Sequence, residues 1–371
     1  MAENKKILLK SSAGDNLYPR ASLDNLVDVV GGTTAVQVPT LDSDGRIESR
    51  FLPTGMSLLD SDGRIDSRYL PPDFFPPAAR VTLNGTIYVS SGALLRDAEE
   101  TSGFIRVLSG GSAKRITVTS GNFTVSSGGA VTDMTWNSPG FMYIPGGHVQ
   151  FLDCRKGTIE VQKGGFLEHV TASTGCLLFV SSGGTATNIV EYGGYVRVPT
   201  GAVGQFEQTV IPNLALSASQ SATIHSGNQV SNATISSGGS LHVFEEGTLT
   251  GQCSVLNGGS MVLYNGAILD FRIADMSPGD TARFNDVTKI SRSGNAVVSY
   301  TLTVAEDQPS GVYAIGGNCS SWNTELQVRT DDGVSLGTPL ALNGTLTANG
   351  MVFSLSIIDN ELSVTVSRSN Q

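Results

Sequence analysis

Apolar residues recur in pairs through the middle of the chain, with one position between the members of each pair. Each pair follows a glycine by two and four residues, and these glycines return every seventeen to nineteen residues. Residues at i and i+2 share one face of a β-strand, so each pair predicts a short half-buried strand. The seven glycines and their pairs are Gly85 with Ile87/Val89, Gly103 with Ile105/Val107, Gly121 with Phe123/Val125, Gly140 with Met142/Ile144, Gly157 with Ile159/Val161, Gly175 with Leu177/Phe179 and Gly194 with Val196/Val198.

Further glycines and apolar positions complete each repeat. A second glycine follows the first by seven or eight residues and predicts a turn, because glycine adopts conformations that a Cβ atom obstructs. A weaker apolar position six residues later predicts a second strand. The second glycines are Gly92, Gly110, Gly128, Gly147, Gly164, Gly183 and Gly201, and the weaker apolar positions are Ile116, Met134, Val170 and Ile189.

A unit of about eighteen residues is too short to bury an apolar face alone, so neighbouring copies must stack around a shared core. The pattern predicts an all-β fold, a parallel β-solenoid of about 18-residue coils over residues 79–270. Its register slips between Ile211 and Leu214 and then resumes. A β-sandwich with many Gly/Ser turns is the competing interpretation, but a sandwich has no reason to keep this register.

Strict alternation with hairpin turns replaces the glycine repeat in residues 271–371. We expect an antiparallel β-sandwich there, which caps the open end of the solenoid and protects its unpaired strand edge. The expected strands are 296–304, 326–328, 351–357 and 362–366, and the expected turns are Asp332-Gly333, Asn343-Gly344, Asn349-Gly350 and Asp359-Asn360.

A duplicated segment distinguishes residues 1–78. Leu41–Pro53 returns as Leu59–Pro71 with eleven of thirteen positions identical. Its Asp-Gly pairs predict turns, and its few apolar residues cannot form a sizeable core, so we expect an extended arm that docks on another copy of the chain or on a partner. The Asp-Ser-Asp-Gly runs also suggest calcium, but the bidentate Glu at position twelve of an EF-hand loop is missing.

Composition narrows the functional class. Glycine supplies 44 of 371 residues and charged residues only 15%, which indicates a turn-dense structural protein rather than a helical enzyme. A net charge of −10 argues against nucleic-acid binding, which relies on lysine and arginine. We expect no secretory signal and no membrane insertion, because no apolar run is long enough for either.

The residues with reactive side chains are scattered. We expect reduced thiols at Cys154, Cys176, Cys253 and Cys319, since the 22-residue spacing of the first two is out of register with the repeat. The four histidines, His148, His169, His225 and His242, do not predict a zinc site. We expect no cofactor, no metal site and no catalytic residue, and the sequence leaves the binding residues unknown.

Two groups of residues keep alternatives open. Tyr313 and Trp322 suit either a sugar-binding surface or core packing, and we favour packing. The acidic residues of the middle region would support polysaccharide cleavage only if two of them converged. They are Asp97, Glu99, Glu100, Asp133, Asp153, Glu160, Glu168, Glu191, Glu207, Glu245, Glu246 and Asp270.

Segments such as Val180–Val190 and Val230–Ser240 resemble the passenger repeats of AIDA-type autotransporter adhesins. This resemblance covers roughly residues 82–270 and implies a stiff displayed scaffold and adhesion. The autotransporter's translocator barrel is not evident in the chain.

The duplicated arm motif resembles the linker near the N-termini of bacteriophage tail-fibre proteins, and Lys6–Arg20 is similar to the starts of such proteins. The resemblance implies a non-enzymatic, trimeric receptor-binding fibre of the virion tail, assembled in the host cytoplasm. Its arm would bind tail or baseplate proteins and its distal part a host-surface glycan or protein. The alternatives are a bacterial surface adhesin of AIDA type and a polysaccharide-degrading tailspike.

Overall fold

A computed structural model of the chain describes Leu9–Lys10, Asn16–Leu17 and residues 81–369. The chain divides into two compact units, Met1–Ala78 and Ala79–Gln371. In the first unit β1 (Leu9–Lys10) pairs antiparallel with β2 (Asn16–Leu17). The duplicated segment lies outside the described residues, so its turns, its calcium alternative and its docking remain predictions.

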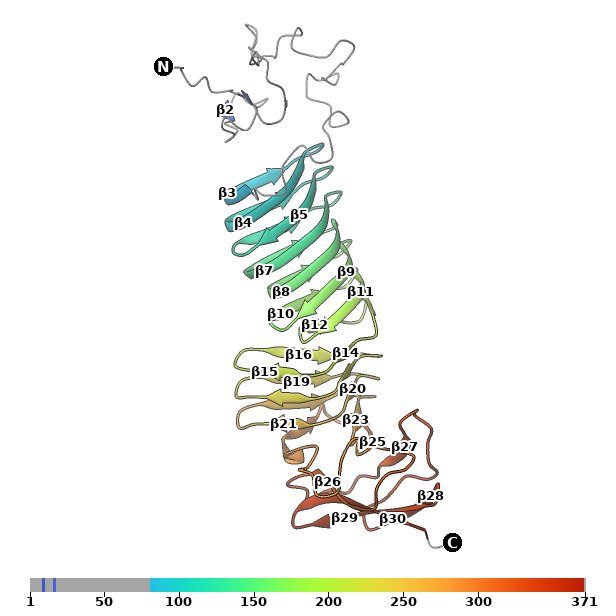
Figure 1. Cartoon of the computed structure of the whole chain (residues 1–371). Coiled ribbons are helices and arrows are strands. Elements are labelled where there is room, and N and C mark those ends of the chain that lie inside the picture. The colour runs from blue at the N-terminus through green and yellow to red at the C-terminus, as the bar shows by residue number, and fades with distance from the viewer. Residues whose placement is uncertain (1–8, 11–15, 18–80, 370–371) are drawn as a thin grey trace, which may run out of the picture. The chain divides into compact units, whose positions relative to one another are not determined.

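The second unit confirms the predicted fold class: it is a parallel β-solenoid that ends in an antiparallel sheet (Figure 1). Among the described residues its helical structure is a single turn, η3 (Val287–Lys289). No described helix is long and apolar enough to span a membrane.

Each coil of the first part of the solenoid has two walls. The first wall is built from parallel strands that run before the repeat glycine, and the second from strands that follow it. Long strands bend from one wall into the other, which makes a single eleven-stranded sheet. The strands are β3 (Val81–Val89), β4 (Leu94–Val107), β5 (Ser112–Val118), β6 (Asn122–Val125), β7 (Ala130–Ile144), β8 (His148–Val161), β9 (Phe166–Ser173), β10 (Cys176–Val180), β11 (Thr185–Tyr192), β12 (Tyr195–Arg197) and β13 (Val203–Phe206).

The repeat glycines are required where coils approach closely. Gly157 has φ +91°, and a Cβ atom there would lie 1.9 Å from the carbonyl oxygen of Ser138 on the preceding coil. Any other residue would force the coils apart as well as strain the backbone.

The predicted register slip marks a change of cross-section. From Val210 onward each coil has three short walls, because the corner at Pro212 and Asn213 separates two strands that continue around the coil. The three sheets are formed by β14 (Val210–Ile211), β17 (Gln229–Val230), β20 (Thr248–Leu249) and β23 (Ile268–Asp270); by β15 (Leu214–Leu216), β18 (Ala233–Ile235) and β21 (Cys253–Val255); and by β16 (Ser221–Ile224), β19 (Ser240–Val243), β22 (Ser260–Leu263) and β24 (Ile290–Arg292).

Parallel pairing continues beyond residue 270. β25 (Ser299–Val304) and β27 (Gln327–Thr330) extend the wall of β23. An antiparallel sheet in the order β26-β30-β29-β28 follows. Its strands are β26 (Gly311–Gly316), β28 (Thr345–Ala348), β29 (Met351–Ile358) and β30 (Glu361–Arg368). The predicted Asn349-Gly350 and Asp359-Asn360 turns connect β28 to β29 and β29 to β30, all four residues with positive φ.

The core lies inside the coils. The second-strand residues Ile116, Met134, Val170 and Ile189 are each at most 2% exposed, and most of the predicted pairs also face the core. The prediction is wrong for Leu177 and Phe179: β10 pairs Cys176, not Gly175, with Gly157, so Leu178 and Val180 face inward in their place. Two clusters of buried side chains result, one in the two-walled part and one that runs from Ile211 into the antiparallel sheet.

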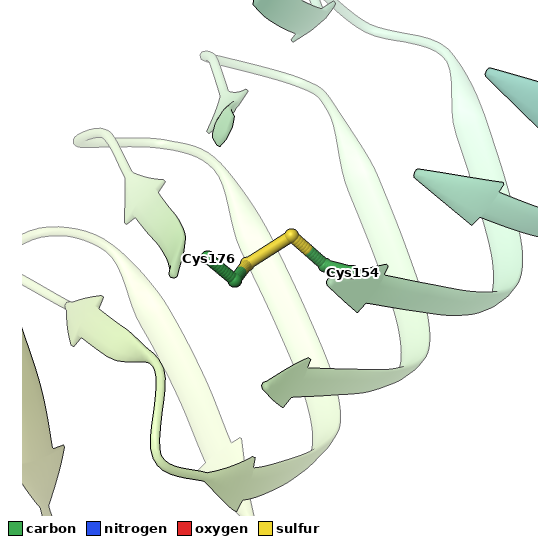
Figure 2. Close-up of a disulfide and its surroundings, with 2 residues drawn as sticks. All are labelled: Cys154 and Cys176. Atoms are coloured by element: carbon green, nitrogen blue, oxygen red, sulfur yellow. A yellow bond between two sulfur atoms is a disulfide. The ribbon is translucent and has the colours of Figure 1, made fainter. Parts of the chain in front are cut away.

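The prediction of reduced thiols is wrong for one pair of cysteines. Cys154 and Cys176 form a disulfide with 5.7 Å between their Cα atoms, and both are fully buried (Figure 2). Cys154 ends the first wall of one coil, whereas Cys176 begins the second wall of the next. The 22-residue spacing is therefore one coil plus the corner between the two walls. The prediction of reduced thiols considered only cysteines on the same wall, where a spacing of about eighteen residues would be needed. Cys253 and Cys319 are free and buried, as expected.

Candidate functional site

A bulge bends the first wall of the solenoid at the same place in six successive coils. One residue per coil has φ between +52° and +58° and is left out of the strand pairing. This extra residue places two consecutive side chains outside, so inward residues follow at i, i+3 and i+5, as in Ala113, Ile116 and Val118. The six residues with left-handed backbone are Asp97, Arg115, Asp133, Phe151, His169 and Asn188.

The bend creates a groove on the outer face of this wall, which we call the wall groove. Its volume is about 430 Å³. Most of its lining comes from equivalent positions on β7, β8, β9, β11 and the residue after β13, so the same wall contributes to it in five consecutive coils. The lining residues are Asp133, Met134, Thr135, Phe151, Leu152, Asp153, His169, Val170, Thr171, Asn188, Val190 and Glu207.

An aromatic pair lies in the middle of the wall groove. The rings of Phe151 and His169 stack with centroids 4.9 Å apart and an interplanar angle of 12°. Asn188 Nδ2 lies 3.2 Å from His169 Nε2, so the amide donates a hydrogen bond to the ring when that nitrogen is unprotonated. Phe151 is nevertheless 48% exposed, which is a large apolar surface for a residue in a recess.

The structure brings three of the acidic residues into this groove. Asp133 lies 3.6 Å from Lys114, Asp153 accepts hydrogen bonds from Arg155, and Glu207 lies 4.0 Å from His169 Nδ1. The sequence alone does not show which of the acidic residues lie near one another. The stacking of the coils places these three on one surface. The other acidic candidates of the list do not line the groove.

A second recess of about 530 Å³ lies beside the last coils. Its floor holds the buried carboxylate of Asp270, which accepts hydrogen bonds from the hydroxyls of Thr250 (3.0 Å), Thr301 (2.7 Å) and Thr303 (2.8 Å). Arg329 lies 3.4 Å from the same carboxylate. At the rim Arg272 pairs with Asp331 at 2.7 Å. The carboxylate of Asp270 therefore already has hydrogen-bond and ion-pair partners within the protein.

Two buried carboxylates occupy one inward-facing column of the two-walled part. Strand pairing aligns Glu100, Val118, Trp136, Cys154, Ala172 and Glu191. Glu191, at one end, accepts four hydrogen bonds from Thr223, His225 and Asn228. At the other end neither carboxyl oxygen of Glu100 has a hydrogen-bond partner. Burial raises the pKa of Glu100.

Tyr313 lies in the core and Trp322 packs against it, which confirms the packing interpretation of both aromatic residues. Tyr313 is fully buried and donates its hydroxyl to the carbonyl of Pro309. Trp322 packs edge-on against Phe271 and Tyr300 and donates its indole N–H to the carbonyl of Thr324. Within residues 81–369 and the two short N-terminal strands, no group of three His, Cys, Asp or Glu side chains is arranged to hold a metal.

No protein-family model matches the chain, and no curated protein proves similar to it. Among solved structures, the chain is similar to the crystal structure of a TibC-catalysed, hyper-glycosylated TibA fragment of residues 55–350. Identity is 23%, the match covers 59% of this chain and 90% of that fragment, and the TM-score is 0.31.

Proposed function

We propose that this protein is a non-enzymatic adhesive fibre in which the β-solenoid is a stiff spacer between an N-terminal attachment arm and a receptor-binding surface. The observation that carries the proposal is coil stacking, since parallel pairing links successive coils from β3 to β13 and again from β14 to β27. Backbone hydrogen bonding through each of these stretches holds a binding surface at a set distance without the entropy of a flexible linker.

The first candidate is a bacteriophage tail fibre. The duplicated Leu-Asp-Ser-Asp-Gly-Arg-Ile segment of residues 41–71 supports this candidate, because it resembles tail-fibre linkers. In this proposal the arm binds a tail or baseplate protein, the chain is a homotrimer of the virion, and three arms bury their few apolar residues together. Light scattering of the purified chain tests the trimer, and a monomer would contradict it.

The second candidate is a bacterial surface adhesin. The Cys154–Cys176 disulfide favours it, because disulfides form and persist mainly in oxidising compartments and at cell surfaces. The solenoid itself serves either candidate equally well.

Fractionation of the source culture separates the two candidates. Quantitative mass spectrometry of purified phage particles and of washed bacterial envelopes should find this chain enriched in the particles if it is a tail fibre. Enrichment in envelopes supports the adhesin, and a chain confined to the cytosol would contradict an adhesive fibre of either kind.

A further inference from the structure

We propose that the wall groove binds a linear neutral glycan, laid along the solenoid axis across the coils of β7, β8, β9 and β11. This inference rests on the proposed function, because it assigns the adhesive surface and its ligand class. It places the binding surface on the side of the spacer rather than on the C-terminal antiparallel sheet.

The repeat of the groove suits a repeating ligand. Its lining comes from equivalent positions of stacked coils, which are separated by about 4.8 Å in a parallel sheet. That step is close to the length of one sugar residue in an extended polysaccharide. Successive sugars can therefore meet equivalent positions of successive coils.

The groove side chains have the chemistry that sugars require. The exposed ring of Phe151 offers an apolar surface to the C–H face of a pyranose, and its stacking on His169 fixes its orientation. Carboxylate, amide and hydroxyl groups beside it can exchange hydrogen bonds with sugar hydroxyls. These groups come from Asp133, Thr135, Asp153, Thr171, Asn188 and Glu207.

Charge and backbone geometry select the ligand. The lining holds the carboxylates of Asp133, Asp153 and Glu207 and no lysine or arginine, in a chain of net charge −10, which disfavours uronic or sialic acid polymers. Lys114 and Arg155 pair with Asp133 and Asp153 from outside the lining and offset part of this charge. The strands beneath the groove are paired on both sides, so no free edge is available for a peptide strand.

The left-handed residues support the assignment. Each non-glycine residue in this conformation costs of order 1 kcal/mol. The bulge imposes it in each of the six coils, including at Asp97 and Arg115 outside the groove, so the informative feature is which residues occupy it within the groove. Phe151 and His169 have larger side chains than the Asp and Asn residues that tolerate this conformation best, and they are the pair that stacks.

Calorimetric titration of the full chain with hexamers of glucose, mannose, xylose and N-acetylglucosamine tests the proposal, with a galacturonate hexamer as the acidic comparison. We expect at least one neutral hexamer to bind and the galacturonate hexamer not to bind. Phe151→Ala should weaken binding about tenfold, the upper range of an aromatic contact. Phe151→Leu should weaken it similarly while it keeps apolar bulk in the fold.

Phe141→Ala is the matched control, because Phe141 is also 48% exposed but lies on the second wall. Failure of all neutral hexamers to bind, preference for galacturonate, or equal loss in the Phe141 and Phe151 variants would overturn the groove assignment. Attachment of the full chain to a panel of bacterial cells separates this failure from failure of the adhesive function. Cell attachment that survives Phe151→Ala contradicts the groove alone, whereas no attachment to any cell contradicts the adhesive function itself.

Discussion

Glu191 accepts a hydrogen bond from the imidazole Nδ1 of His225 at 2.7 Å, across the junction between the two-walled and three-walled parts of the solenoid. The backbone N–H of His225 donates to the other carboxylate oxygen at 2.8 Å. The ring of His225 also stacks between Phe206 and Phe244, with centroid distances of 4.3 and 4.6 Å. This contact therefore joins two coil geometries that have no common strand register.

Glu191→Ala should destabilise this junction by about 3 kcal/mol or more, because it leaves several buried donors without an acceptor. Hydrogen exchange should quicken first at β16, which contains Thr223. Glu245→Ala, which changes an exposed acid two coils away, should leave exchange unaltered. Unchanged exchange at β16 in the Glu191 variant would show that the carboxylate does not hold the junction.

Glu100→Gln should remove part of the pH dependence of stability. A carboxyl whose pKa is higher in the folded than in the unfolded chain stabilises the fold fully below the unfolded pKa, and this contribution is lost as the pH rises through the folded pKa. Burial raises the pKa of Glu100, so its contribution should decline from acidic toward neutral pH. The urea midpoint of the variant relative to the wild type should therefore rise over that range.

Glu99→Gln is the control for this measurement, because Glu99 neighbours Glu100 in sequence but is only partly buried. The urea midpoint of the Glu99 variant, relative to the wild type, should not rise from acidic toward neutral pH. Parallel pH profiles for the wild type and Glu100→Gln would contradict the assignment.

Reduction of the Cys154–Cys176 disulfide should lower the free energy of unfolding by about 3 kcal/mol, the entropic effect of closing a loop of this length. Urea unfolding with and without dithiothreitol measures the effect, and a Cys154→Ala, Cys176→Ala double variant should not respond to the reductant. Alkylation of the unfolded, unreduced chain should label two cysteines, Cys253 and Cys319. Labelling of all four would mean that the disulfide is absent.

Gly157→Ala should destabilise the solenoid more than Gly333→Ala. Both glycines have positive φ, so both substitutions strain the backbone by about 1 kcal/mol or more. Only at Gly157 would the new methyl group also collide with a neighbouring coil, whereas nothing lies within 4 Å of a Cβ atom at Gly333. Thermal midpoints measure both variants, and equal losses would contradict the close-packing role of the repeat glycines.

The solenoid was predictable because pairs such as Ile105 and Val107 recur at a fixed distance from a glycine. Stacking of equivalent coils is the simplest fold that keeps such a period. The turns at Asn349-Gly350 and Asp359-Asn360 were predictable for a similar local reason. Glycine and asparagine tolerate positive φ better than other residues, so their positions indicate where such turns occur.

The wall groove was not predictable. Arg115, Phe151 and His169 adopt left-handed backbone because neighbouring coils impose the bulge, and their side chains give no local signal of it. The disulfide and the Glu191 network were missed for a related reason. Both join positions from different walls or different parts of the solenoid, and sequence spacing within one wall cannot identify such contacts.

Electron microscopy of the parent particles or cells, with a gold label on the C-terminus of this chain, tests the central claim most directly. An adhesive fibre held by its N-terminal arm predicts gold at a constant distance outside the surface and loss of all gold when residues 1–78 are deleted. Gold distributed at random distances, or retained on the surface after that deletion, would contradict the account.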